Sequence, residues 1–150
     1  MSKALRSSLL LLSVLTASLS GDAAAQTLTI RVEGLRSERG SIRVGFYASA
    51  AQWETKRSNF QRAGGKRAHA AGEGVVVLEF DDVPAGRYGV AIADDENDNG
   101  HIDWGWLLPK EGFGFSNYHS KGLARPDFEE FAFDLPAGEH VEIAVRVRYL

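Results

Sequence analysis

The sequence predicts an all-β protein: a small antiparallel β-sandwich with one long ordered loop excursion. Two observations support this prediction. Six short segments alternate apolar and polar residues with a period of two, which is typical of strands with one buried and one solvated face. Turn-forming residues separate these segments, and no long crossover helices are indicated between them, which favours two packed antiparallel sheets.

The alternation is clearest near the end of the chain, where Val141, Ile143 and Val145 share one face and Glu142 and Arg146 lie on the other. Similar patterns occur five more times. The predicted strands cover residues 28–32, 42–46, 76–80, 88–92, 131–135 and 141–149.

Three short segments have the composition of tight turns. Residues 38–40 (Glu-Arg-Gly) separate the first two predicted strands and suit a hairpin in which the glycine adopts a positive φ. Residues 84–86 and 136–138, both Pro-Ala-Gly, separate the third strand from the fourth and the fifth from the sixth. A closed β-barrel would show the same signals and is the alternative to the sandwich.

Two segments do not fit this series of strands. Residues 50–73 contain Trp53, Phe60 and several Lys and Arg residues, and they predict a short helix or an irregular excursion. We interpret the basic cluster as a solvated loop, with an anionic partner as the alternative. Residues 94–129 are much longer than an ordinary connection, and long loops are usually functional or disordered. Their aromatic residues argue against disorder and predict an ordered cap on the sandwich.

The first 25 residues have the features of a signal peptide. Lys3 and Arg6 form a basic start, residues 9–19 are largely apolar, and three alanines at 23–25 supply a cleavage pattern. We therefore expect cleavage after Ala25, one β-sandwich domain over residues 26–150, and a periplasmic or secreted location without a transmembrane segment after cleavage. An uncleaved anchor is the alternative, but a membrane-spanning helix needs about 20 apolar residues.

Charge and cysteine content exclude several function classes. Removal of residues 1–25 changes the 17 basic and 20 acidic residues of the whole chain to 15 and 19, a net charge of −4 with His neutral. This acidity gives no reason to expect a nucleic-acid partner, which requires a basic face. The absence of Cys excludes disulfides, thiol catalysis, lipoprotein attachment and most structural zinc sites.

Residues 95–103 have the spacing of a calcium-binding loop. Oxygen-bearing side chains at relative positions 1, 3, 5 and 9 can converge on one point, and Gly100 at position 6 permits a sharp turn. With the backbone carbonyl at position 7, the predicted metal ligands are Asp95, Asn97, Asn99, His101 and Asp103. These five ligands fall short of the 6–8 oxygens that Ca²⁺ prefers.

The loop departs from the complete calcium motif at position 12, which is Trp106 where a bidentate Glu is expected. A carboxylate from elsewhere would have to replace it, and the candidates are Asp94, Glu111, Asp127 and Glu129. A turn without an ion is the alternative, because Asp and Asn side chains bond their own backbone in Asx-turns. If Ca²⁺ binds, the two Asn ligands predict a Kd of about 10⁻⁴ to 10⁻³ M.

Several motifs together resemble the bacterial domain-of-unknown-function family 2141. They are residues 88–100 (YGVAIADDENDNG) followed by Ile102 and Asp103, residues 109–117 (PKEGFGFSN), 32–36 (VEGLR), 40–47 (GSIRVGFY), 84–88 (PAGRY) and 128–129. The resemblance covers nearly all of residues 26–150 and implies a secreted or periplasmic protein without an assigned activity.

The turn at residues 84–88 is also similar to that of transthyretin-like and carboxypeptidase-regulatory-like sandwiches. The expected architecture is therefore a transthyretin-like or immunoglobulin-like sandwich rather than a barrel. The chain departs from the family pattern after Gly100, where Lys-Leu/Met and an Asn-rich stretch are expected, so the ligands there are less well defined by the resemblance.

A non-catalytic binding or structural module is the function class that the sequence favours. Five aromatic residues follow the acidic loop and are candidates for contacting a carbohydrate, a peptide or a protein partner in the cell envelope: Trp104, Trp106, Phe113, Phe115 and Tyr118. The alternative is that these rings form a second small core.

Signals for catalysis are weak, and no catalytic residue is assigned. Ser116 does not lie in a Gly-x-Ser-x-Gly nucleophile elbow. The four His residues lack the spacing of zinc ligands. The nearest approach to a base–carboxylate pair is His119 with Asp127. A periplasmic hydrolase of unknown substrate therefore stays only as an alternative function.

Overall fold

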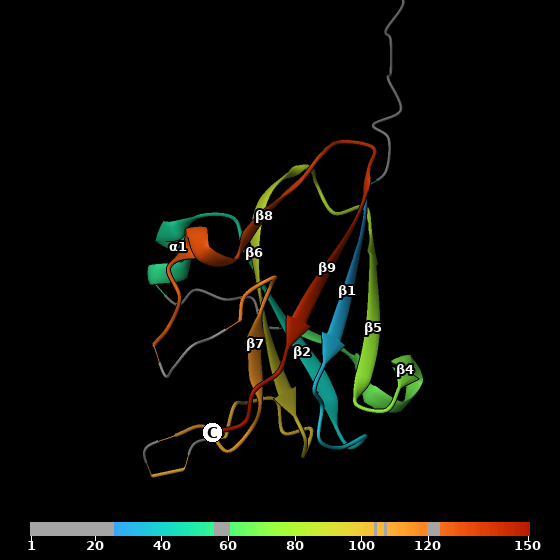
Figure 1. Ribbon diagram of the computed structural model, residues 1–150, viewed down its shortest axis with the longest axis vertical. Coiled ribbons are helices and arrows are strands. Elements are labelled where there is room, and N and C mark those ends of the chain that lie inside the picture. Colours follow the sequence, from blue (N-terminus) through green and yellow to red (C-terminus); the bar gives the residue numbers. More distant parts are fainter. Residues whose placement is uncertain (1–25, 56–60, 104, 107, 120–123) are drawn as a thin grey trace, which may run out of the picture.

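Two β-sheets pack face to face in the computed structural model (Figure 1). The structure describes residues 26–55, 61–103, 105–106, 108–119 and 124–150. The predicted signal peptide, Phe60 and Trp104 lie outside the described residues. Within the described part of the chain, no helix combines the length and apolar character needed to cross a membrane.

The first sheet has the strand order β4-β5-β1-β9. Its strands are β1 (Thr27–Glu33), β4 (Ala70–Gly72), β5 (Val75–Asp81) and β9 (His140–Arg146). Strand β1 pairs antiparallel with β5 and parallel with β9, where Ile30 lies opposite Ile143. The sandwich is therefore mostly antiparallel, with one parallel pair at the edge formed by β9.

The second sheet has the order β3-β2-β6-β7, and β8 pairs with β6 beside β7. Its strands are β2 (Ser41–Tyr47), β3 (Gln61–Gly65), β6 (Gly86–Asp95), β7 (Phe113–Phe115) and β8 (Ala132–Leu135). The helical segments are α1 (Ala50–Glu54), the 3₁₀ turn η1 (Lys66–His69) and α2 (Phe128–Phe131).

The six predicted strands are confirmed as β1, β2, β5, β6, β8 and β9, with two boundary errors. The last strand is predicted to continue to Tyr149, whereas β9 ends at Arg146. Phe131 ends α2 and does not begin a strand. The excursion over residues 50–73 contains α1, β3, η1 and β4, and the longer excursion over 94–129 contains β7. These additional strands are only 3 to 5 residues long, and their sequences contain little period-two alternation.

The hairpin predicted at residues 38–40 is wrong, because β1 and β2 belong to different sheets. Gly40 does have the expected positive φ of 76°. However, a Cβ atom at this position would lie 2.0 Å from the Asp95 carbonyl oxygen, so the glycine serves a close approach to the end of β6. The turns at 84–86 and 136–138 likewise connect one sheet to the other.

The two sheets are joined along the edge where β7 meets the end of β9. The backbone groups of Phe113 and Arg148 exchange two hydrogen bonds of 3.0 and 2.8 Å, and Ser116 forms a bridge with Val145. In the described residues no pairing closes the opposite edge between β3 and β4. The architecture is therefore a sandwich with one joined edge and not a closed barrel.

The hydrophobic residues form two clusters. The larger cluster lies between the sheets and includes fully buried Leu28, Ile30, Ile42 and Val90. The second cluster lies where α1 and α2 pack beside β6, and its buried members are Tyr47, Trp53, Ala91, Phe128 and Phe131. Val90 and Ala91 are neighbours on β6 but belong to different clusters, as expected for a strand buried on both faces.

Candidate functional site

Asp95, the first residue of the predicted calcium loop, is the last residue of β6 and is 1% exposed. Its Oδ1 atom accepts a hydrogen bond of 3.0 Å from the backbone N–H of Asn99. Its Oδ2 atom accepts bonds from the N–H of Gly100 (2.9 Å) and from Arg43 Nε (2.8 Å). Asp95 thus accepts the backbone hydrogen bonds that close the turn, and it forms an ion pair with Arg43 of β2.

Asp103 holds the other end of the loop. Its two carboxylate oxygens accept hydrogen bonds from Asn97 Nδ2 (2.6 Å) and Asn99 Nδ2 (2.9 Å). The amide oxygens of these asparagines accept from backbone N–H groups two residues further on, in Asn99 and His101. The four predicted side chains therefore lie within one hydrogen-bonded turn, which includes the backbone of His101.

The protein itself supplies a donor to each side-chain oxygen of Asp95, Asn97, Asn99 and Asp103. This arrangement matches the alternative of an Asx-turn without an ion. For a cation to bind, the amides of Asn97 and Asn99 would have to turn their oxygens toward Asp103. In the described part of the chain, no group of three or more His, Asp or Glu side chains is placed to hold a metal ion.

The four candidates for a bidentate ligand have other partners. Asp94 pairs with Lys66, Glu129 pairs with Arg87, and Asp127 is the N-cap residue of α2 in a capping box with Glu130. Trp106 at position 12 is 95% exposed. Of these four residues, Glu111 is the one whose carboxylate accepts hydrogen bonds from the loop, and both come from backbone N–H groups.

Glu111 binds backbone N–H groups near both ends of the loop. It is 4% exposed, and its two carboxylate oxygens accept hydrogen bonds from the N–H groups of Glu96 (3.1 Å) and Asp103 (3.0 Å). Burial raises the pKa of Glu111 above its ordinary value, while these two hydrogen bonds act against the increase. Glu111 therefore fixes the shape of the loop as a backbone acceptor.

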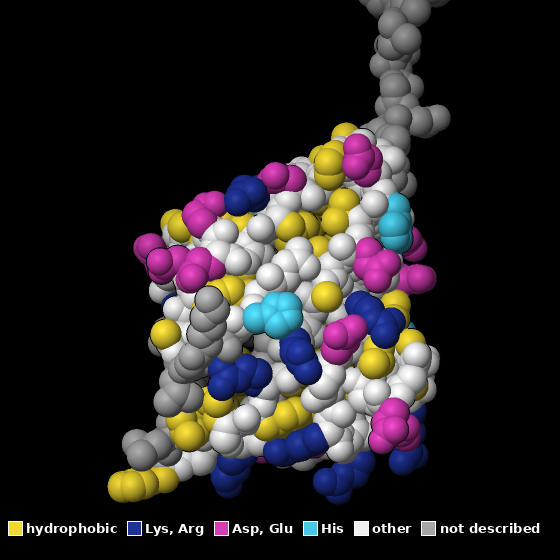
Figure 2. All heavy atoms as spheres, in the orientation of Figure 1, with side chains coloured by type: hydrophobic (Ala, Val, Ile, Leu, Met, Phe, Trp, Pro, Cys, Tyr) yellow, Lys and Arg dark blue, Asp and Glu magenta, His cyan; other side chains and the backbone are white. Residues whose placement is uncertain are grey.

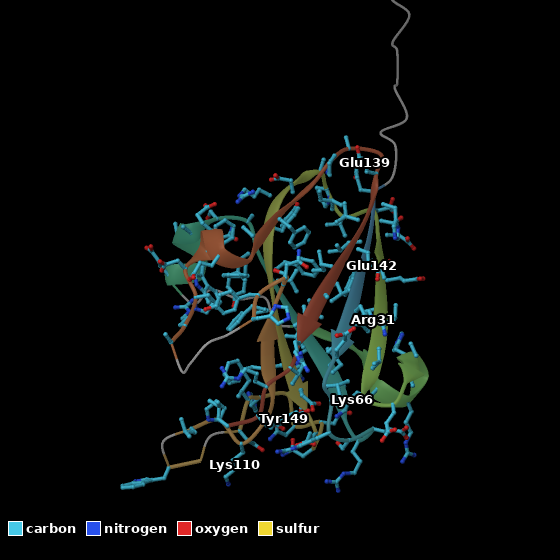
Figure 3. All side chains as sticks on the ribbon, viewed as in Figure 1. Arg31, Lys66, Lys110, Glu139, Glu142 and Tyr149 are labelled. Atoms are coloured by element: carbon cyan, nitrogen blue, oxygen red, sulfur yellow. The ribbon has the colours of Figure 1, made fainter. Side chains whose placement is uncertain are left out.

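A buried ion pair involves Asp94, the residue that immediately precedes the loop. Lys66 Nζ is 2.7 Å from Asp94 Oδ1, and both side chains are at most 1% exposed. The hydroxyl of Tyr149 donates a hydrogen bond to the other oxygen of Asp94. Figure 3 shows Lys66 and Tyr149 near the same end of the sandwich. Burial raises the pKa of Asp94, and burial together with the bond to Asp94 raises the pKa of Tyr149.

The predicted aromatic candidates that the structure describes have different surroundings. Phe115 and Tyr118 are half-buried, with ring centroids 6.2 Å apart, and Phe115 also packs on Trp53 and Phe131 of the second cluster at 5.5 Å each. Phe113 is half-buried beside Phe115, at 6.0 Å. Trp106 is exposed to solvent. One side of Phe115 and of Tyr118 therefore packs against the second hydrophobic cluster, as the alternative interpretation expected.

The other side of these rings borders a surface hollow of about 240 Å³. Its lining comes from β7, from the segment that follows it and from the end of β9, and consists of Phe113, Gly114, Phe115, Tyr118, His119, Arg146 and Arg148. Figure 2 shows Lys and Arg side chains gathered over the lower part of this face, where β7 and the end of β9 lie. The lining combines rings with cationic side chains and contains no carboxylate.

Two features of the backbone hold the hollow in shape. A Cβ atom at Gly114 would lie 2.5 Å from the Arg146 carbonyl oxygen, so β7 can approach β9 only because this residue is glycine. Asn117 adopts a positive φ of 51° and bonds to Ala144 through both its N–H (2.7 Å) and its side-chain oxygen (3.2 Å). These contacts fix the position of Tyr118 and His119 beside β9.

Ser116 has a structural role. It is fully buried, its hydroxyl donates to the carbonyl of Phe131 (2.6 Å), and its oxygen accepts from the N–H of Val90 (3.0 Å). It therefore links α2 to β6. His119 is exposed at the rim of the hollow, and the carboxylate considered for it, Asp127, is the N-cap residue before α2.

The sequence interpretation missed Arg146, Arg148 and His119 as neighbours of the aromatic residues. The two arginines lie two residues apart on the polar face of the last strand, which is the signal that could have identified them. The pairing of β7 with the end of β9, which brings them to the rings, joins segments separated by α2 and β8 and has no local signature.

Comparison with known families gives a match over most of the chain. A family model described as "Uncharacterized protein conserved in bacteria (DUF2141)" matches residues 30–144. The chain belongs to the DUF2141 family. The DUF2141 match begins within β1 and ends within β9, so it includes the loop and the rings, whereas Arg146 and Arg148 follow it. No curated protein and no solved structure gave a match.

The first prediction for this DUF2141 protein concerns the buried charge pair. Lys66→Met leaves the Asp94 carboxylate buried without its cation, and we expect it to reduce the free energy of unfolding by about 3–5 kcal/mol in urea denaturation at pH 7. Lys110→Met, at an exposed lysine, is the control and should change it by no more than about 0.5 kcal/mol. The double variant Lys66→Met/Asp94→Leu should regain much of the loss. Equal stability of Lys66→Met and wild type would refute this assignment.

The second prediction concerns Glu96, whose carboxylate pairs with Arg36 and accepts from Ser37 Oγ. The hydrogen bond from Arg36 lowers the pKa of Glu96 below its ordinary value of 4.5. The ionised form therefore stabilises the fold above pH 4.5, and this contribution is lost as the pH falls through the lower, folded-state pKa.

Glu96→Gln should thus destabilise the protein by about 1 kcal/mol at pH 7, a value that allows for the half-exposed Arg36, and by less at acidic pH. Urea denaturation across the pH range measures both effects. The exposed Glu142 gives the control variant Glu142→Gln, which should follow the wild type. A difference between Glu96→Gln and wild type that grows toward acidic pH would contradict the prediction.

Proposed function

We propose that this DUF2141 protein is an exported, non-catalytic binding module of the cell envelope, and that its ligand site is the hollow beside β7. One observation supports the site above all: half-buried rings of Phe113, Phe115 and Tyr118 border a concave surface between the two sheets. The proposed export is supported by the signal-peptide pattern of residues 1–25.

The rings are held in position before any ligand arrives. Phe115 packs against Trp53 and Phe131, and Trp53 is itself fixed by a hydrogen bond of 2.7 Å from its Nε1 atom to the carbonyl of Pro126. A preorganised aromatic surface binds with a smaller loss of conformational entropy than a mobile one. Rings of this kind stack on sugars and on apolar groups of peptides.

The size of the hollow limits what it can hold. Ligand pockets commonly have volumes of about 300–1,000 Å³, and this hollow has about 240 Å³. It suits one sugar ring or one side chain of a larger ligand. A second hollow of about 460 Å³ lies over the turn from β1 to β2, and its lining contains no aromatic ring: Glu38, Arg39, Gly40, Gly65, Lys66, Arg67 and Ala68.

The third prediction tests the binding site. In NMR titrations of the ¹⁵N-labelled protein with glucose, glucuronate and glucose 6-phosphate, we expect shifts of the amide signals of Gly114, Phe115 and His119. Tyr118→Ala should weaken binding about threefold to tenfold, because one stacking ring is lost. The matched control is Trp106→Ala, which removes an exposed ring outside the hollow. If no probe shifts these signals, the hollow is not the binding site.

We also propose a calcium-stabilised loop at residues 95–103, as a second function of this module. It is supported by the convergence of Asp95, Asn97, Asn99 and Asp103 within one hydrogen-bonded turn. A bound cation would take the place of the two asparagine amides as the partner of Asp103, with the carbonyl of His101 and water as further ligands.

The fourth prediction is that about 10 mM Ca²⁺ raises the thermal midpoint relative to EDTA, because a ligand that binds only the native state stabilises it. The free energy of unfolding should increase by about 2.7 kcal/mol when Ca²⁺ is in hundredfold excess over its Kd. Asp103→Asn should abolish the calcium-dependent increase, whereas Asp134→Asn, at an exposed carboxylate that pairs with Arg87, should retain it. Identical midpoints in Ca²⁺ and EDTA would leave the ion-free turn as the correct description.

A further inference from the structure

The hollow beside β7 has a cationic wall in an otherwise acidic protein. Arg146 and Arg148 are two residues apart on β9 and its extension, so both side chains leave the strand on the same face, while Val145 and Val147 point into the core. Successive residues on one face of a strand are separated by about 6.6 Å. Both side chains therefore contribute positive charge to the same hollow.

The charge of Arg146 is not neutralised by a neighbouring acid. Glu33 lies opposite Arg146 in the pairing of β1 with β9, but its carboxylate is 2.7 Å from Arg31 Nε. Within the described part of the chain, no carboxylate lies within ion-pair distance of Arg146. The guanidinium group of Arg146 is therefore available for a ligand.

The position of the arginines relative to the rings is fixed by backbone contacts. Phe113 and Arg148 exchange two backbone hydrogen bonds, and Gly114 lies against the carbonyl of Arg146. The rings and the guanidinium stems thus border one concave surface, with His119 at its rim. Guanidinium groups bind carboxylate and phosphate oxygens through paired, charge-assisted hydrogen bonds.

We infer that the hollow binds a carboxylate- or phosphate-bearing ring unit, such as an acidic sugar residue, with the ring stacked on Phe115 and Tyr118 and the anionic group on Arg146. This inference rests on the proposed function of the hollow as a binding site. It adds the chemical class of the ligand, which the aromatic rings alone do not define.

The test compares glucose, glucuronate and glucose 6-phosphate, which share a ring but differ in charge, in the NMR titration described above. Both anionic probes should bind at least about tenfold more tightly than glucose, since hydrogen bonds to charged groups contribute more than neutral ones. The tighter of the two anions identifies the preferred group as a carboxylate or a phosphate. Raising the NaCl concentration should weaken binding of the anions and leave that of glucose unchanged.

Arg146→Gln should reduce the affinity for the tighter anion about tenfold and leave the affinity for glucose unchanged. Arg67→Gln, at an exposed arginine outside the hollow, removes the same charge and should leave both affinities unchanged. The inference is overturned if glucose binds as tightly as the anions, or if Arg146→Gln does not weaken anion binding. In both cases the shifts at Gly114 and Phe115 would still support the binding site. The absence of shifts with all three probes would overturn the binding site as well.

Discussion

The ion pair between Lys66 and Asp94 organises the end of the sandwich that carries the loop. Asp94 precedes the loop on β6, Lys66 begins η1 after β3, and Tyr149 reaches the same carboxylate from the segment after β9. A buried carboxylate is tolerated only when a cation and hydrogen-bond donors surround it. These requirements fix three parts of the chain, from both sheets, at one point.

The loop at residues 95–103 follows from this anchor. Asp95 is held between Arg43 and the backbone of the turn, and Glu111 binds the N–H groups at both ends of the loop. Asp95 and Glu111 thus accept hydrogen bonds from backbone donors that would otherwise be unsatisfied. The same geometry places the side-chain amides of Asn97 and Asn99 on the carboxylate of Asp103, which is why one sequence pattern is compatible with an Asx-turn and with a cation site.

The hollow lies beside the joined edge of the two sheets. Its rings have two environments, since Phe115 packs on Trp53 and Phe131 on one side and borders the hollow on the other. This arrangement gives a rigid aromatic surface without a large exposed apolar patch. The cationic wall comes from a different sheet, so the site exists only where β7 pairs with the end of β9. The DUF2141 match includes the rings, while the two arginines follow it.

The sequence by itself determined the main strands and the acidic turn, because period-two burial and Asx-turn chemistry act over a few neighbouring residues. It also identified Phe113, Phe115 and Tyr118 as candidates. Only the tertiary structure decided that β1 and β2 lie in different sheets and that β9 pairs parallel with β1. It also decided the partners of Asp94 and the placement of the arginines beside the rings. These features depend on contacts between residues distant in the chain, which leave no periodic or local pattern in the sequence.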